Sequence, residues 1–282
     1  MENSSPLLHR CALFVEIAAL VLIVSGAYVT SMREASANPD ITAAGPLPGA
    51  GVHLVLGIAV VALAFFLAGL AWVADRRGPV RLLAVLTVVT GVLDAWIATP
   101  IKLSAGPAAL HAGMAPLFFG CAAAMAMMTS AKWNAASEPV GDRGMHFLRP
   151  LAISAPPLVL LQIVLGALYR HKETSVMWHM AGAMVVSLVT LIAAMVVMQQ
   201  FPEHKKLRGP AIHLMSVVLL QVALGVTAFT MQLLETESTV TLAVFTAAHV
   251  LVGNLVFGAS ISFAATLARG MRAETAAEVS TV

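Results

Sequence analysis

The sequence has few charged residues. Asp, Glu, Lys and Arg make up 11% of its 282 residues, while 59% are hydrophobic; an average soluble domain is about 25% charged. A water-soluble enzyme is excluded because one core could not bury so much apolar surface. The formal net charge of +2 excludes a disordered chain and a nucleic-acid-binding protein, which needs a basic surface to contact phosphates.

Cysteine is also scarce. Cys11 and Cys121 lie in or beside long apolar runs. Two such residues do not make a disulfide framework, and their spacing is not that of a zinc site. The apolar run after Arg10 is about 20 residues long, and no small-residue cleavage site follows it. We therefore expect this run to be a first membrane span rather than a secretory signal.

Long apolar runs fill most of the chain. A helix needs about 20 residues to cross the hydrocarbon core, and eight runs qualify: 11–32, 50–74, 79–98, 108–131, 148–169, 176–200, 210–233 and 241–268. Strands of a membrane β-barrel alternate over segments of about 10 residues, whereas these runs are continuous. The sequence predicts an all-α polytopic membrane protein with eight transmembrane helices.

The basic residues predict the orientation of these helices. One side of the membrane would hold twelve of them: Arg10, Arg76, Arg77, Arg81, Lys132, Arg143, Arg149, Lys205, Lys206, Arg208, Arg269 and Arg272. The other side would hold four: Arg33, Lys102, Arg170 and Lys172. Cytoplasmic loops carry the excess of Lys and Arg. We therefore expect both termini in the cytoplasm and the protein in the cell (inner) membrane.

The chain repeats at about half its length. The odd helices carry similar stretches centred on Gly26, Gly91, Gly166 and Gly225. The even helices each carry one histidine: His53, His111, His179 and His249. The repeat predicts two four-helix bundles in parallel arrangement, residues 1–135 and 145–270, followed by a cytoplasmic tail at 271–282. The glycines of the odd helices are typical of packing notches between membrane helices.

The four histidines are predicted to converge near the outer leaflet. The even helices enter from the outer face, so three histidines lie within about the first turn, and His249 lies about two turns deep. Two imidazoles from facing helices make a six-coordinate heme iron site, and helix bundles hold cofactors in this way. The alternative for each histidine is a polar contact between helices.

Other polar groups at the same end are candidate site residues. Arg33 and Arg170 end the first and fifth spans, where they either clamp heme propionates or anchor the helix ends. Asp94 lies at about the depth of the histidines, where it would relay a proton, orient a histidine or bond to its own helix end. Gln162 and Gln221 precede two of the glycines by four residues, and we expect interhelical hydrogen bonds from them.

These features resemble the heme A synthase family of cytochrome-oxidase assembly proteins. The resemblance rests on the eight spans, the duplicated unit, the histidine near the outer start of each even helix, and two stretches, Ile23–Thr30 and Gln162–His171. It implies oxidation of a heme O methyl group to the formyl group of heme A. It also implies that His179 and His249 hold a heme b, and that His53 and His111 face the substrate heme.

The chain departs from the family at two places. The family has a glutamate three residues before the first histidine and an arginine directly after it, where this chain has Ala50 and Leu54. Many bacterial members also have a cysteine pair in the first outer loop, and residues 33–49 contain none. The carboxylate of the oxidation step must then come from elsewhere, and Asp94 is the candidate.

Three functions remain open at this point. The first is a heme A synthase-type oxidoreductase with a quinone or ferredoxin-type electron donor, and with heme O synthase or oxidase assembly factors as partners. The second is a diheme b-type electron-transfer protein, and the third is a non-catalytic heme-handling assembly factor. A transporter is disfavoured because no pair of broken helices marks a midplane site.

Overall fold

The computed structural model describes residues 5–36, 49–98, 105–135, 146–234 and 239–279. Every regular element in this part is a helix: α1 (Pro6–Ser36), α2 (Ala50–Ala74), α3 (Gly78–Ala98), α4 (Ala105–Thr129), α5 (Ala131–Asn134), α6 (Leu148–Arg170), α7 (Val176–Gln200), α8 (Lys205–Leu234) and α9 (Thr239–Val279). All except α5 are long and apolar enough to cross a membrane. The predicted all-α class and the eight candidate spans are confirmed.

Several helix ends differ from the expected ones, three of them by five residues or more. Helix α1 begins at Pro6, α8 begins at Lys205, and α9 continues to Val279, through most of the segment expected to be a tail. A helix satisfies every backbone polar group within one segment, as a spanning element must in lipid. The same property lets a helix continue beyond the apolar run without a break.

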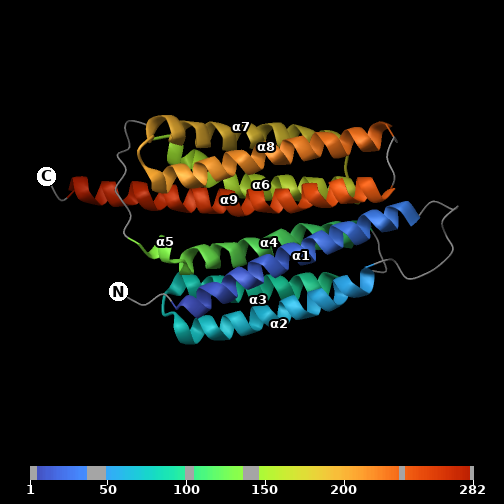
Figure 1. The fold of residues 1–282 in the computed structure, drawn as a ribbon, viewed down its shortest axis with the longest axis horizontal. Coiled ribbons are helices and arrows are strands. Elements are labelled where there is room, and N and C mark those ends of the chain that lie inside the picture. The colour runs from blue at the N-terminus through green and yellow to red at the C-terminus, as the bar shows by residue number, and fades with distance from the viewer. Residues whose placement is uncertain (1–4, 37–48, 99–104, 136–145, 235–238, 280–282) are drawn as a thin grey trace.

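The helices form two groups of four, which lie one above the other in Figure 1. In the first group α1 contacts α2 and α4, while α3 contacts the same two helices. In the second group α6 contacts α7 and α9, while α8 contacts the same two helices. Helices α1 and α4 of the first group pack on α9 of the second, and α4 also contacts α6. The start of α1 and the end of α9 lie at the same end of the molecule (Figure 1).

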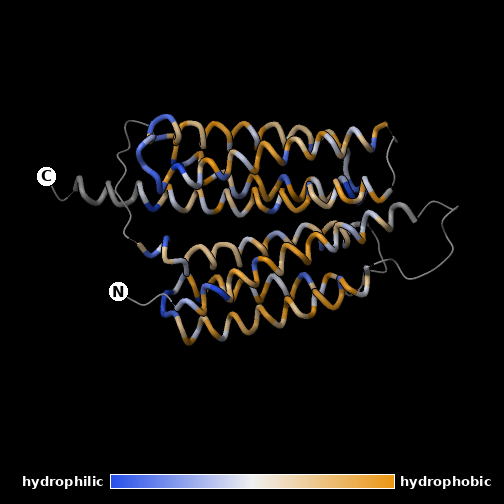
Figure 2. Tube along the Cα trace, viewed as in Figure 1, coloured by the Kyte–Doolittle hydropathy of each residue, from blue (hydrophilic) through white to orange (hydrophobic). Residues whose placement is uncertain are grey.

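The outer surface of the helices is apolar. Large side chains such as Val73 (86% exposed), Met184 (75%) and Trp96 (71%) point outward. Figure 2 shows hydrophobic residues along the middle of the long helices and hydrophilic ones gathered mainly near the ends. Apolar patches of this extent are not left in water by soluble monomers, so the surface fits a lipid environment.

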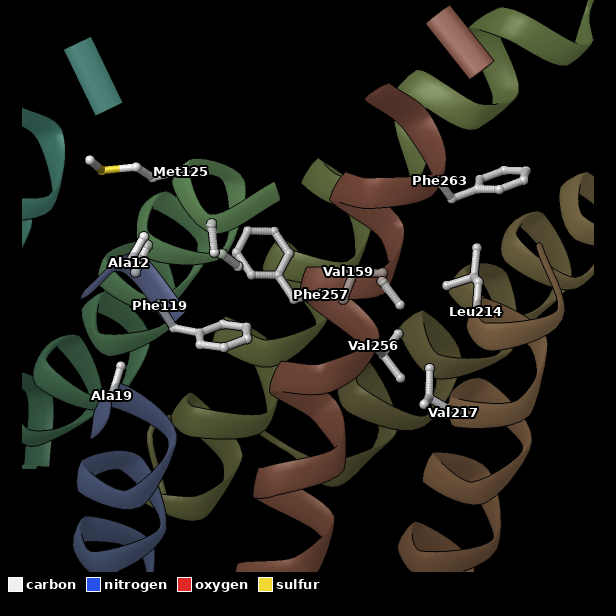
Figure 3. Close-up of a cluster of buried hydrophobic side chains, with 14 of the residues drawn as sticks. Ala12, Ala19, Phe119, Met125, Val159, Leu214, Val217, Val256, Phe257 and Phe263 are labelled. Atoms are coloured by element: carbon white, nitrogen blue, oxygen red, sulfur yellow. The ribbon is translucent and has the colours of Figure 1, made fainter. Parts of the chain in front are cut away.

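A reciprocal contact joins the two groups. A Cβ at Gly120 of α4 would lie 2.5 Å from Cε1 of Phe257, and one at Gly258 of α9 would lie 3.2 Å from Cζ of Phe119. Both phenylalanine rings are buried, and Figure 3 shows them at the boundary between α4 and α9. The glycine of each Phe-Gly dipeptide therefore packs against the phenylalanine ring of the other. The two dipeptides are 138 residues apart, the same spacing as His111 and His249.

The turn between α2 and α3 is held by an ion pair. The Arg77 side chain donates to both carboxylate oxygens of Asp75, with the shortest N–O distance at 2.6 Å, and Arg81 donates to the backbone oxygen of Asp75. The Arg77 hydrogen bonds keep the pKa of the Asp75 carboxyl below its ordinary value. This anionic group lies outside the candidate spans.

Candidate functional site

The four histidines expected to lie together, one each on α2, α4, α7 and α9, meet in two pairs. The ring centres of His53 and His111 are 6.1 Å apart with an angle of 79° between the planes, and those of His179 and His249 are 6.3 Å apart at 83°. All four side chains are half-buried. The structure thus places together, within each group of helices, the histidines that the sequence predicts to pair.

Local helix starts position two of these rings. Gly49 precedes α2 with a left-handed φ of 84°, which glycine adopts without strain, and its backbone oxygen accepts from the His53 backbone N at 2.9 Å. At the start of α7 the Ser175 hydroxyl accepts from the backbone N of Met177. His53 and His179 therefore both lie in the first turn of their helices, three residues after Ala50 and Val176.

Three glycines, one each on α1, α6 and α8, pack directly against imidazole rings. Cβ atoms built at Gly26, Gly166 and Gly225 would lie 2.9, 2.9 and 2.8 Å from Cε1 of His53, His179 and His249. Any side chain there would displace the ring. The expected packing notch is present at these three positions, and what fills it is the histidine of the following helix. Gly91 of α3 differs, because the ring against it is Phe118, at 3.0 Å.

Hydrogen bonds fix the protonation of the first pair. The Ser25 hydroxyl donates to the backbone oxygen of Leu22 at 2.7 Å, so its oxygen accepts from Nδ1 of His53 at 2.8 Å. The Asp94 carboxylate accepts from Nδ1 of His111 at 2.8 Å. With the proton on Nδ1, the lone pair of Nε2 is free to bind a metal. Asp94 is buried and occupies the place of an outer partner that orients a ligand.

Glutamine amides support the second pair. The Gln162 amide nitrogen donates to the backbone oxygen of His179 at 2.7 Å and lies 2.9 Å from its Nδ1. The Gln221 amide nitrogen lies 3.3 Å from Nε2 of His249. Nδ1 of His249 is buried with no hydrogen-bond partner in the described part of the chain. Both glutamines form the expected interhelical contacts, and their partners are the histidines.

The glutamines also rest on glycines. A Cβ at Gly182 would collide with Oε1 of Gln162, and one at Gly253 would lie 3.0 Å from Nε2 of Gln221. In the α6–α7 pair, and again in the α8–α9 pair, a glycine of each helix thus packs against a polar side chain of the other: the glycine of the first helix contacts the histidine, and that of the second contacts the glutamine. The glycine that follows each histidine in these hairpins is covered by an amide.

Of the two arginines predicted as site residues, the structure describes the side chain of Arg170 but not that of Arg33. Arg170 ends α6, and its Nη2 donates to the backbone oxygen of Ala27 at 2.8 Å and to the Ser31 hydroxyl at 2.5 Å. Because Ala27 and Ser31 belong to α1, Arg170 links the two groups of helices. Arg33 lies in the last turn of α1, and its side chain falls outside the described residues.

The spacing of each pair fits two ligands of one metal ion. A histidine nitrogen binds a transition metal at about 2 Å, and its ring centre lies about 1 Å further, so rings on opposite sides of one ion have centres about 6 Å apart. The distances of 6.1 and 6.3 Å agree with this value. No cluster of three or more His, Cys, Asp or Glu residues that could hold an ion occurs in the described residues. Iron held by two imidazoles would take its other ligands from a cofactor such as a porphyrin.

Two features of this arrangement were not predicted from the sequence. Ser25, the partner of His53, precedes the notch glycine Gly26 and has no distinguishing signal in an apolar helix. The Phe119-Gly120 and Phe257-Gly258 contact could have been found from its spacing of 138 residues. No known family model matches the chain, and no curated protein matches its sequence.

Proposed function

We propose that the protein is a heme-binding membrane oxidoreductase of the heme A synthase type, acting on heme O. The observation that carries the proposal is the pair of matched histidine sites, each spaced for one metal ion and each lacking a third protein ligand in the described part. A porphyrin supplies the remaining iron ligands and the redox chemistry when it is bound.

The two pairs take different roles in this proposal. His179 and His249 bind a heme b as the resident cofactor, and the Gln162 amide that donates to the backbone oxygen of His179 ties α7 to α6 beside them. His53 and His111 face the substrate heme O and its product heme A. The support for this division is Asp94, a carboxylate in contact with the first pair. The linked Asp94 and His111 side chains are placed to hold or move a proton beside the substrate site.

The arginines fit this proposal as propionate partners at the open end of the sites. Arg170 already spans from α6 to α1. Its guanidinium would bind a propionate while staying tied to the Ala27 carbonyl, since the group carries five N–H donors. Arg33 is proposed for the same role by its position at the end of α1.

The setting of the protein belongs to the same proposal. The two groups of helices are two copies of one four-helix unit, which the reciprocal Phe-Gly contact supports. Both termini are cytoplasmic, and the histidines lie towards the outer leaflet of the cell (inner) membrane, as the Lys and Arg distribution supports. The electron donor is a quinone or a ferredoxin-type protein. Heme O synthase and oxidase assembly factors are the proposed partners.

A diheme electron-transfer protein is the second candidate function. The observation in its favour is the near-identical geometry of the two pairs, 6.1 and 6.3 Å with angles of 79° and 83°. Two equivalent sites suit two resident hemes that exchange electrons. In that case the heme periphery would not be changed chemically.

Pigment analysis separates these functions. The protein is expressed in a host that supplies heme O, purified in detergent, and its hemes are extracted and separated by chromatography. The proposed synthase yields hydroxylated or formyl heme beside heme b, whereas the electron-transfer protein yields heme b alone. Protein without any heme rejects both functions.

Matched substitutions test the ligands. His179→Ala and His249→Ala are expected to abolish the absorption bands of a bis-histidine heme b. His213→Ala is the control, because this exposed histidine of α8 lies near the other end of the helices. Survival of the bands in both ligand variants contradicts the assignment.

A further inference from the structure

A small basic pocket lies far from the histidine pairs, at the end of the molecule where α1 begins. It is bounded by α5 from the first group and by α8 and α9 from the second. Arg269 of its lining follows His249 by 20 residues on α9, which is about 30 Å along a helix and about the thickness of the hydrocarbon core. The pocket and the histidine pairs therefore lie near opposite membrane boundaries.

The pocket concentrates positive charge. Lys132, Lys206, Arg269 and His204 all line it, and none of the lining residues in the described part is acidic. The amino group of Lys132 reaches over the start of α8, where it lies 3.9 Å from a Cβ built at Gly209. Lys132 from the first group of helices and Arg269 from the second thus line one space, and both would attract an anion there.

Arg269 is held in place for a ligand. Its Nη1 donates to the backbone oxygen of Trp133, and its guanidinium lies over the Trp133 ring, 4.8 Å from the ring centre. A guanidinium has five N–H donors, so the carbonyl leaves others for an anion. The fixed, planar group suits phosphate oxygens, which arginine binds through paired hydrogen bonds.

The size and position of the pocket limit the kinds of ligand that it can bind. Its volume is about 100 Å³, the space of roughly three water molecules, which suits a tetrahedral oxyanion. The candidate span in α4 ends at Thr129, and that in α8 begins at Lys205. The pocket is therefore level with lipid headgroups, and Met127 and Leu207 give it an apolar side.

We propose that this pocket binds a phosphate group between the two groups of helices. The phosphate comes either from an anionic phospholipid of the surrounding leaflet or from the aqueous phase. Basic pockets between membrane helices bind anionic lipid headgroups in this way. Such a ligand would bridge the two halves of the chain at the end opposite the histidines.

Native mass spectrometry of the delipidated full-length protein, in detergent and chloride buffer, tests the proposal. It is titrated separately with phosphatidylglycerol, phosphatidylcholine and inorganic phosphate. Phosphatidylglycerol is expected to bind more tightly than phosphatidylcholine if the source is lipid, and inorganic phosphate to bind and displace it if the source is aqueous. Each cation near the surface contributes about fivefold to lipid binding, so Lys132→Ala with Lys206→Ala weakens binding about 25-fold.

Lys205→Ala is the matched control. Lys205 is an exposed neighbour of Lys206 and does not line the pocket, so this variant, which changes the net charge as much as each single lysine variant, is expected to lose less affinity than either of them. All variants are compared as monodisperse protein, and the single variants Lys132→Ala and Lys206→Ala replace the double variant if it does not fold. The proposal is overturned if phosphatidylglycerol and phosphatidylcholine bind equally and phosphate does not bind. It is also overturned if the lysine variants match the control.

Discussion

The contact between Phe257 and Gly120 offers a direct test of how the two halves pack. In Gly120→Ala, the new Cβ would lie 2.5 Å from Cε1 and 3.2 Å from Cζ of Phe257. The ring is 6% exposed, so it can move only by displacing its neighbours. Overpacking of this kind costs about 1–3 kcal/mol.

Helix propensity partly offsets that cost. Replacing glycine by alanine within a helix stabilises the fold by up to about 1 kcal/mol. Gly69→Ala in α2 isolates this gain, because no atom lies within 4 Å of its built Cβ. The difference between the two variants therefore reports the clash, about 1–3 kcal/mol. At 2–4 °C per kcal/mol, Gly120→Ala melts roughly 2–12 °C below Gly69→Ala.

The assay is the fraction of monodisperse protein that remains after heating in detergent. Gly258→Ala is expected to fall between the other two variants, because its built Cβ lies 3.2 Å from the nearest atom of Phe119. Adding Phe257→Leu should shrink the penalty of Gly120→Ala, since the clashing ring is gone. Equal melting of Gly120→Ala and Gly69→Ala, or an unchanged penalty beside Phe257→Leu, would refute the packing described.

Three further predictions concern the site and the turn. Gly166→Ala should abolish bis-histidine heme absorption by displacing the imidazole it seats, while Gly57→Ala, with its nearest neighbour at 3.9 Å, keeps the spectrum. Asp94→Ala should weaken heme binding at the first pair about 10- to 100-fold in a heme titration; Asp94→Asn keeps an acceptor and loses less, and no loss in either variant contradicts the orienting role. The Asp75 pKa is lowered by Arg77, so the ion pair stabilises the fold above the unfolded-state pKa of about 4 and this stabilisation is lost as pH falls through the lower folded-state value. Melting temperature should therefore fall more steeply below about pH 4 in the wild type than in Asp75→Asn, and parallel curves would contradict this.

The sequence predicts the spans well because the membrane requires them. A helix must carry about 20 apolar residues to cross, so each span is visible as a continuous run. The histidines stand out for the same reason, since an ionisable residue within a span is rare. Their pairing within each group was expected from the sequence spacing, which places one histidine on each of α2, α4, α7 and α9.

The partners of the histidines could not be predicted with the same certainty. Which face of α3 carries Asp94 towards His111 depends on how each helix is rotated about its axis. In a soluble helix an apolar stripe fixes that rotation, but in lipid both faces are apolar and the stripe is absent. Three roles for Asp94 therefore stayed open until the structure placed it on His111.

The boundary between the halves is hidden in the sequence for a related reason. Phe119-Gly120 lies in an apolar run where neither residue is unusual, and only the match to Phe257-Gly258 distinguishes it. Small residues mark helix contacts in membranes, yet the chain has 20 glycines. Selecting the pair that meets across α4 and α9 requires the three-dimensional arrangement.

That boundary has the symmetry of a homodimer interface. Because each half presents the same dipeptide to the other, the contact is isologous, the kind that two identical subunits form around a twofold axis. A single half therefore contains both the ring and the notch needed to associate with a copy of itself. The covalent connection between the two halves raises the effective concentration of surfaces that already fit.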